Sequence, residues 1–271
     1  MAQESAGNPI ERLGATVLHG VQYAGGLSLM LADVCLWLAK AVRHPKSRDL
    51  MSLGEQIVRV GVRSIGIVAL VQGFVGVILA LQLTPTLEDY GQQAQIATII
   101  GISGFRMLGP IFTAIVISGF AGASIAAELG TMVVAEEIEA MEAMALNPTR
   151  FLVLPRVLAT FACMLLLTTF ADLMIAGGGW LTARLALGAD VYNRYWERMR
   201  DGLVYKDYFT GLIQGGVFGV LIGLIACHEG LHVQGGAEGV GRATTMTVVY
   251  SIVAIVLAAS VCTVIFYTFG F

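Results

Sequence analysis

The stretch Ser64–Leu83 reads SIGIVALVQGFVGVILALQL and contains no Asp, Glu, Lys or Arg. A helix of about 20 apolar residues is long enough to cross the hydrocarbon core of a bilayer. Two charged residues, Arg106 and Asp172, occur in the other segments of this kind, which are Ile96–Ala127, Val157–Ala183, Tyr208–Cys227 and Ala243–Phe271. We therefore expect an all-α integral membrane protein with about five transmembrane helices.

The composition supports this class. Of the 271 residues, 56% are hydrophobic and 13% are charged, and the mean hydropathy is +0.78, whereas soluble domains carry roughly 25% charged residues. Sixteen Lys and Arg against nineteen Asp and Glu leave no basic surplus for nucleic acid. The four cysteines form no CxxC pair, and His228 and His232 have no further ligands nearby, so we expect neither disulfides nor a metal site.

The N-terminal part, residues 1–53, differs from the transmembrane remainder, residues 54–271. Leu13–Ala39 is apolar enough to cross a membrane, but it contains His19, Gln22, Gly25, Gly26 and Asp33. We favour an amphipathic helix on the membrane surface over a sixth crossing. The second span is longer than a bilayer requires and contains Pro110, so it should kink there or project into water.

Basic residues near the span ends predict the orientation. Seven Lys and Arg precede the first span, whereas the hairpin Thr84–Gln95 has none, so the N-terminus should be cytoplasmic. Five crossings then place the C-terminus on the outer side of the membrane. The loop Leu187–Asp207 runs against the rule, because the outer side carries five basic residues, Arg184, Arg194, Arg198, Arg200 and Lys206.

The fourth span carries a glycine every four residues. In lipid, such a stripe of small residues lets two helix backbones approach closely. The sequence leaves open whether this stripe packs within one chain or forms a dimer seam. Its members are Gly211, Gly215, Gly219 and Gly223.

Between the second and third spans lies Glu128–Leu146, ELGTMVVAEEIEAMEAMAL, followed by Pro148. Ala, Glu, Met and Leu are strong helix formers and proline ends helices, so we expect one cytoplasmic helix over this range. It is either a docking helix for a soluble partner, with an adaptable Met-rich side, or an ordinary solvated loop helix.

Arg106 is a lone cation in an apolar span, where charge is expensive and must face a cavity, a partner or the bundle interior. It could equally donate to backbone carbonyls, and Asp172 could neutralise it. Gly235–Arg242, GGAEGVGR, has glycine spacing like a P-loop, but Arg242 and Ala243 stand where Lys and Ser or Thr are needed. We interpret it as a turn leading into the last span and expect no ATP site in the chain.

Three strings in the segments Arg106–Arg156 and Gly235–Val249 carry a family resemblance: ELGTM, AMEAMALNP and GVGRATT. In them, and over most of the chain from about Gly54, the sequence resembles the MlaE family of permeases of phospholipid and Mce-type ABC transporters. The resemblance implies a non-catalytic homodimeric permease in the bacterial inner membrane. It would move phospholipid between that membrane and a periplasmic carrier and so maintain outer-membrane lipid asymmetry.

The resemblance also implies partners and site residues. Two ATPase subunits would bind ATP and Mg²⁺, a hexameric ring of Mce-domain subunits would receive lipid, and a STAS-domain protein would join the ATPase. The matching coupling-helix positions are Glu128, Thr131, Met132, Glu136, Glu137 and Met141. The positions matching the lipid pocket near the dimer axis are Leu79, Thr86, Leu87, Tyr90, Arg106 and Leu108.

The chain departs from the family pattern at four positions where relatives often carry charge, Met107, Phe120, Met246 and Ala259. Fewer ion pairs in the pocket would leave Arg106 less compensated. Two other functions fit the residues: a secondary transporter that needs no ATPase, and a membrane scaffold in which the glycine stripe serves assembly.

Overall fold

A computed structural model describes residues 9–43 and 47–270, and within these ranges every regular element is a helix. Residues 1–8 and 44–46 of the predicted N-terminal segment, Lys46 among them, and Phe271 at the end of the last span lie outside the described residues. Within the described ranges, six helices are long and apolar enough to cross a bilayer. The predicted all-α membrane fold is confirmed.

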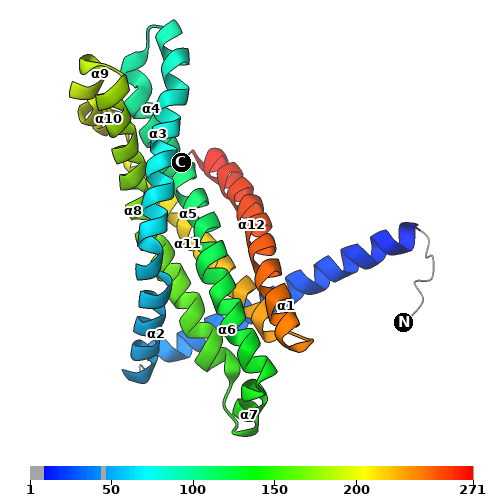
Figure 1. The fold of residues 1–271 in the computed structure, drawn as a ribbon. Helices are drawn as coiled ribbons and strands as arrows, with labels where there is room; N and C mark the ends of the chain where they lie inside the picture. The colour runs from blue at the N-terminus through cyan, green and yellow to red at the C-terminus, as the bar shows by residue number, and fades with distance from the viewer. Residues whose placement is uncertain (1–8, 44–46, 271) are drawn as a thin grey trace.

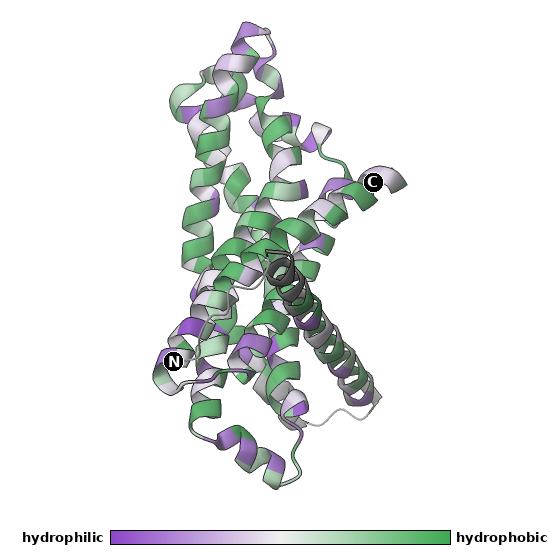
Figure 2. Ribbon diagram, turned by 90° about the vertical axis from the view of Figure 1, so that its right-hand side faces the viewer, coloured by the Kyte–Doolittle hydropathy of each residue, from purple (hydrophilic) through white to green (hydrophobic). Residues whose placement is uncertain are grey.

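Each of the five predicted spans is a long helix (Figure 1). Hydrophobic residues cover the middle of the bundle, and hydrophilic residues gather at its two ends (Figure 2). This is the pattern expected where lipid surrounds the middle and every backbone polar group is satisfied inside a helix. The spans are α3 (Ile65–Asp89), a composite helix over Gln93–Val134, α8 (Leu154–Ala186), α11 (Tyr205–Leu231) and α12 (Gly236–Phe269).

The sixth candidate span, Gly20–Lys40, belongs to α1 (Pro9–Arg43). This helix lies across the long axis of the bundle (Figures 1 and 2). Val34 packs on the main core, whereas Leu29 and Leu36 on other faces are exposed. A crosswise helix with exposed apolar side chains fits a surface location, which stays a prediction.

The composite second span contains two π-helices. α4 (Ile96–Ser103) continues through η3 (Gly104–Leu108) into α5 (Gly109–Ile117), and then through η4 (Ser118–Gly122) into α6 (Ala123–Val134). Pro110 is the second residue of α5, two positions after the end of η3. A π-turn widens the helix and relieves the missing hydrogen bond of a proline. The chain therefore continues through Pro110 as one long helix that reaches toward both ends of the bundle.

The prediction of one helix over Glu128–Leu146 is wrong. α6 ends at Val134, Glu136 adopts a left-handed conformation with φ of 59°, and α7 covers only Glu137–Ala143. A second left-handed residue, Ala145 with φ of 57°, ends α7. The strong helix propensity of the segment is overridden because the chain must turn back toward the third span.

The two ends of the bundle carry different short helices. At one end lie α2 (Ser47–Val60) and α7, which extends beyond α6 (Figure 1). We call this the α7 end. At the other, which we call the α10 end, α9 (Ala189–Asn193) and α10 (Tyr195–Gly202) lie beside the turn between α3 and α4. Short connectors are η1 (Val62–Ser64), η2 (Gln93–Gln95) and η5 (Thr149–Val153).

The buried side chains form two clusters. The larger one joins α6, α8 and α11 and includes Leu129, Met164 and Phe218. The smaller one lies toward the α10 end, where Ile100 and Tyr195 are fully buried. Two separate clusters of buried side chains therefore stabilise the molecule, and one of them lies toward the α10 end.

Candidate functional site

The glycine stripe of α11 packs inside the chain. A side-chain Cβ added at Gly215 would lie 2.6 Å from the Thr168 hydroxyl of α8, and one at Gly219 would lie 2.8 Å from the Thr160 carbonyl oxygen. A Cβ at Gly211 would overlap the carbonyl oxygen of Phe105 in η3, and one at Gly223 would overlap Thr160. Of the two alternatives left open by the sequence, the structure shows packing within one chain.

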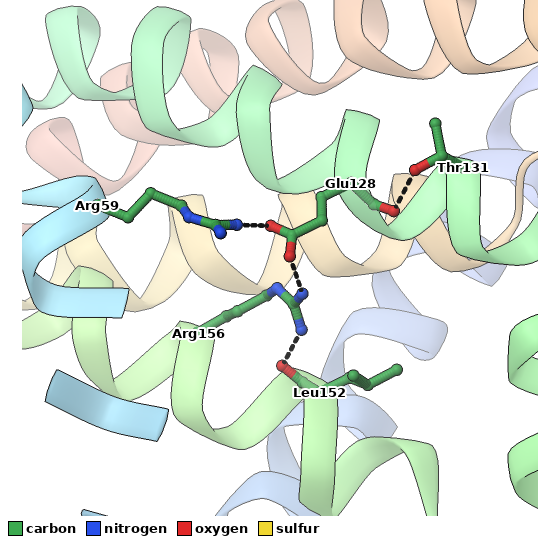
Figure 3. A network of polar contacts seen from close by, with 5 residues as sticks. All are labelled: Arg59, Glu128, Thr131, Leu152 and Arg156. Atoms are coloured by element: carbon green, nitrogen blue, oxygen red, sulfur yellow. Dashed lines mark hydrogen bonds and ion pairs between the residues drawn. The ribbon is translucent and has the colours of Figure 1, made fainter. Parts of the chain in front are cut away.

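Glu128 joins three helices near the α7 end (Figure 3). Its carboxylate forms an ion pair with Arg59 of α2 and a second one, at 3.0 Å, with Arg156 of α8. The Arg156 side chain is only 4% exposed, and it also donates to the Leu152 carbonyl oxygen at 2.9 Å. This carboxylate is therefore engaged inside the chain, whereas the family resemblance implied a contact with the ATPase.

The remaining predicted coupling residues have different surroundings. Thr131 donates to the Glu128 carbonyl oxygen at 2.7 Å, and Met132 packs on the larger core. Glu136 and Glu137 are exposed at the junction of α6 and α7, and Met141 is half-buried. The surface available to a partner is therefore the acidic one around α7.

Arg106 of η3 faces the beginning of α11. Its Nη1 lies 3.6 Å from Asp207 Oδ1, and the arginine side chain is 39% exposed. The second oxygen of Asp207 accepts a hydrogen bond from the backbone N–H of Val204 at 3.1 Å, which fixes the carboxylate at the helix start. Sequence reasoning counted Asp207 only as a loop charge, although its position one residue before the fourth span placed it at the depth of a span end.

Asp172 of α8 lies deep in the bundle. Its side chain is 1% exposed, and among the described residues its Oδ1 has no hydrogen-bond partner. A Cβ at Gly109 would overlap this oxygen, so the glycine provides room for it. Nearby, Gln72 of α3 donates to the Gly109 carbonyl oxygen at 3.0 Å and to the Thr113 hydroxyl at 2.8 Å. The π-helix η3 thus ends beside polar groups in the middle of the membrane helices.

The other predicted lipid-pocket residues extend along α3 and η3. Leu79 and Leu87 are half-buried and pack against the smaller core cluster, as does Phe105. Leu108 is half-buried in η3, whereas Thr86 and Tyr90 are exposed. In this single chain, part of the predicted set is therefore turned outward, toward the space that lipid or a second copy would fill.

Two cavities lie at the α10 end and involve none of the predicted site residues. The first, of 560 Å³, lies between η3, α8, α10 and α11, and we call it the α10 cavity. Its lining residues are Phe105, Leu173, Ala176, Trp196, Met199, Arg200, Leu203, Val204, Tyr205 and Tyr208. The second, of 530 Å³, lies on the other side of α10 and includes Arg194, Tyr195 and Arg198.

The segment GGAEGVGR is not a turn over its whole length. α12 begins at Gly236, and only the positive φ angles of Gly235 and Gly236, 89° and 68°, make the turn from α11. His228 and His232 at the end of α11 have ring centroids 4.2 Å apart. No group of three or more His, Cys, Asp or Glu suited to a metal ion occurs in the described part of the chain.

Comparison with known proteins identifies the family. The model of the family "Permease MlaE" matches residues 53–265. The chain belongs to the MlaE permease family. This MlaE-family protein is a multi-pass membrane protein and the non-catalytic permease component of an ABC transporter, which works with ATPase subunits.

Three relatives show how far the similarity extends. A probable ABC transporter permease of Rickettsia felis is 35% identical over 260 residues, 96% of this chain and 98% of the relative. The intermembrane phospholipid transport system permease protein MlaE of Haemophilus influenzae is 29% identical and covers 90% of this chain and 92% of its own length. The chloroplastic protein TRIGALACTOSYLDIACYLGLYCEROL 1 of Arabidopsis thaliana is 31% identical over 75% of this MlaE-family chain and 58% of its own length.

Proposed function

We propose that this permease forms a homodimer in the bacterial inner membrane and passes phospholipid between that membrane and a periplasmic Mce-domain carrier. Two ATPase subunits, which bind ATP and Mg²⁺, drive it, and a STAS-domain protein joins them. The transport maintains outer-membrane lipid asymmetry. The Haemophilus relative, which is named as an intermembrane phospholipid transport permease, supports the choice of substrate.

One observation carries the coupling mechanism: a single continuous helix runs from the region of α7 to Arg106. Glu136 lies two residues after the end of α6, Glu137 begins α7, and the residues from Val134 back to η3 form one unbroken helical segment. Tilting or translating such a rod at one end moves its other end. An ATPase that displaces α7 therefore displaces Arg106 and the lipid beside it.

The surroundings of Arg106 suit a phosphate group. A separation of 3.6 Å from Asp207 is longer than a normal hydrogen bond, and the guanidinium is partly exposed. Arginine binds phosphate through two parallel N–H···O bonds. The second copy would enclose the half-buried Leu79, Leu87 and Leu108 together with the exposed Thr86 and Tyr90. In this arrangement the acyl chains contact the leucines and the phosphate contacts Arg106.

The proposed binding of the ATPase at α7 also determines how the chain is oriented in the membrane. The α7 end is cytoplasmic because the ATPase binds there, and the α10 end faces the periplasm. The N-terminus is then cytoplasmic, α1 lies on the inner membrane surface, and the C-terminus is periplasmic. Single cysteines placed at Glu137 and Glu197 should be labelled from opposite sides of the membrane by a reagent that cannot cross it.

The coupling test reverses the charge of Glu136 and Glu137 to Lys. We expect the affinity for the ATPase to fall at least tenfold, because the two substitutions reverse the charge of the acidic surface around α7. A tenfold change corresponds to about 1.4 kcal/mol of binding free energy. Unfolding temperature should stay unchanged, since both side chains are exposed. Reversing Glu197 and Asp201 at the α10 end is the matched control and should leave ATPase association intact. Equal association of both double variants with the ATPase would contradict the proposal.

A transport assay separates this function from the alternatives. Substituting Leu79 and Leu87 by Asn in the assembled transporter should reduce ATP-dependent phospholipid transfer between vesicles. Unchanged lipid transfer would favour a scaffold. Flux through the purified permease without ATPase, driven by an ion gradient, would favour a secondary transporter.

A further inference from the structure

The α10 cavity has the lining of a site for an apolar chain. Its walls come from η3, α8, α10 and α11, and aromatic rings are prominent in them: Phe105, Trp196, Tyr205 and Tyr208. Leu173 of α8 is 56% exposed and Trp196 of α10 is 50% exposed. Exposed apolar side chains that surround a hollow of 560 Å³ leave substantial apolar area to be covered by an occupant.

The position of the aromatic residues indicates how deep in the membrane the cavity lies. Tyr205 is the first residue of α11, and Trp196 lies in the preceding short helix α10. Trp and Tyr gather where a helix leaves the hydrocarbon region, because their rings are apolar at one end and polar at the other. The Tyr208 hydroxyl is fixed by a hydrogen bond of 2.9 Å with Thr169. The cavity therefore opens at the depth of lipid headgroups.

Arg200 provides a cation among the lining residues of this cavity. It is exposed in the last turn of α10, and within residues 9–43 and 47–270 no ion pair or hydrogen bond engages its guanidinium. It also belongs to the loop Leu187–Asp207, whose basic residues oppose the charge rule for the proposed outer side. An unpaired arginine at headgroup depth is complementary to a phosphate.

We propose that the α10 cavity binds one diacyl phospholipid, with an acyl chain against Phe105, Leu173 and Trp196 and the phosphate on Arg200. The inference rests on the proposed function for its substrate, but it assigns a second lipid site outside the set around Leu79 and Arg106. Phe105 lines the cavity and precedes Arg106 in η3. A lipid in the cavity would thus contact the residue next to Arg106 in η3, at the periplasmic end of the transport path.

The test is photo-crosslinking of the full chain reconstituted in phosphatidylcholine vesicles. The vesicles contain a minor fraction of phosphatidylglycerol with a diazirine near the end of one acyl chain. We expect adducts at Leu173, Trp196 and Tyr205 in peptide maps. Arg200→Gln should lower their yield about tenfold, because it removes a charge-assisted phosphate contact. Arg198→Gln is the matched control, since it removes the same charge from the face of α10 that lines the other cavity, and it should change the yield less than twofold.

Three results would overturn the proposal. A diazirine diacylglycerol, which lacks phosphate, should give few adducts, and a yield equal to that of phosphatidylglycerol would show an unselective apolar surface. Equal losses in the two arginine variants would show general attraction to an anionic membrane. Adducts of the isolated chain that disappear in the assembled transporter would assign the cavity to a membrane helix of a partner. Because the Leu79 and Leu87 transport assay is independent of these residues, loss of the α10 site alone would leave the proposed function standing.

Discussion

The arginine side chains at the two ends of the bundle differ in their ion pairing. At the α7 end, Arg59 and Arg156 both pair with the carboxylate of Glu128. At the α10 end, Arg198 and Arg200 lie on α10 and Arg194 directly precedes it, and none of the three has an ion pair within the described residues. A buried charge must be paired, because desolvation is costly, whereas an exposed arginine is solvated by water and can bind an external anion. The α7 end therefore uses charge to fix helices, and the α10 end keeps charge available for ligands.

Removal of the Glu128 carboxylate is expected to have the largest effect on the difference between the two ends. Glu128→Gln leaves Arg156, whose side chain is 4% exposed, without its carboxylate. We expect a loss of about 3 kcal/mol in the free energy of unfolding, because an unpaired buried charge is strongly destabilising. SDS titration of the purified protein in mixed micelles measures this change.

Arg59→Gln is the matched control for Glu128→Gln. The Arg59 side chain is 47% exposed, and exposed pairs contribute about 0–1 kcal/mol. If both variants lost the same stability, the cluster would be a surface pair and the contrast between the ends would fail.

Close helix packing, in contrast to ion pairs, is expected to stabilise the α10 side of the bundle. Gly211→Ala would place a methyl group onto the backbone oxygen of Phe105, which no side-chain rotation can relieve. We expect a loss of about 1–3 kcal/mol from overpacking. Gly177→Ala in α8, with nothing within 4 Å of the added atom, should be neutral or slightly stabilising. Equal unfolding curves would mean that α11 and η3 can separate at little cost.

The third prediction concerns the left-handed residues that flank α7. Ala145→Gly should stabilise the α7 end by about 1 kcal/mol, because glycine adopts a φ of 57° without steric cost. Ala143→Gly, inside α7, should instead cost about 1 kcal/mol of helix stability. Slower hydrogen exchange of α7 amides in the first variant and faster exchange in the second would check the pair. Identical exchange would show that position 145 is not constrained in the native protein.

The smallest effect is expected at the α10 end itself. Arg194→Gln combined with Arg198→Gln should change unfolding free energy by less than about 0.5 kcal/mol, since both residues are exposed and neither has an ion pair among the described residues. The same SDS titration applies. A loss above about 1 kcal/mol would reveal a structural role and make the two ends alike.

Hydropathy predicted the spans because lipid imposes one requirement on every crossing segment: about 20 apolar residues in a helix. The same reasoning failed at Glu136, where helix propensity suggested continuation and the chain turns. It also missed α9 and α10, whose short sequences have no long apolar pattern. Local pattern alone does not report where a chain must reverse direction.

The site was predicted less completely than the fold because its contacts join distant parts of the sequence. Glu128 and Arg59 are 69 residues apart, and no local pattern relates them. Asp207 lies opposite Arg106 only because α11 packs on η3 through Gly211. The sequence drew attention to Arg106 and to the glycines of α11, but only the packed bundle shows which residues lie beside them.

The two π-helices of the second span have a consequence for insertions and deletions. A π-turn holds one residue more than an α-turn while the helix on either side keeps its direction. Deleting one residue within η3 or η4 can therefore convert that turn to α-geometry and preserve the facing of α4, α5 and α6. The same deletion in the middle of α8 would rotate half the helix by about 100° and turn its core face to lipid. The span that carries Arg106 can thus accommodate a lost codon locally, at either of its two π-turns.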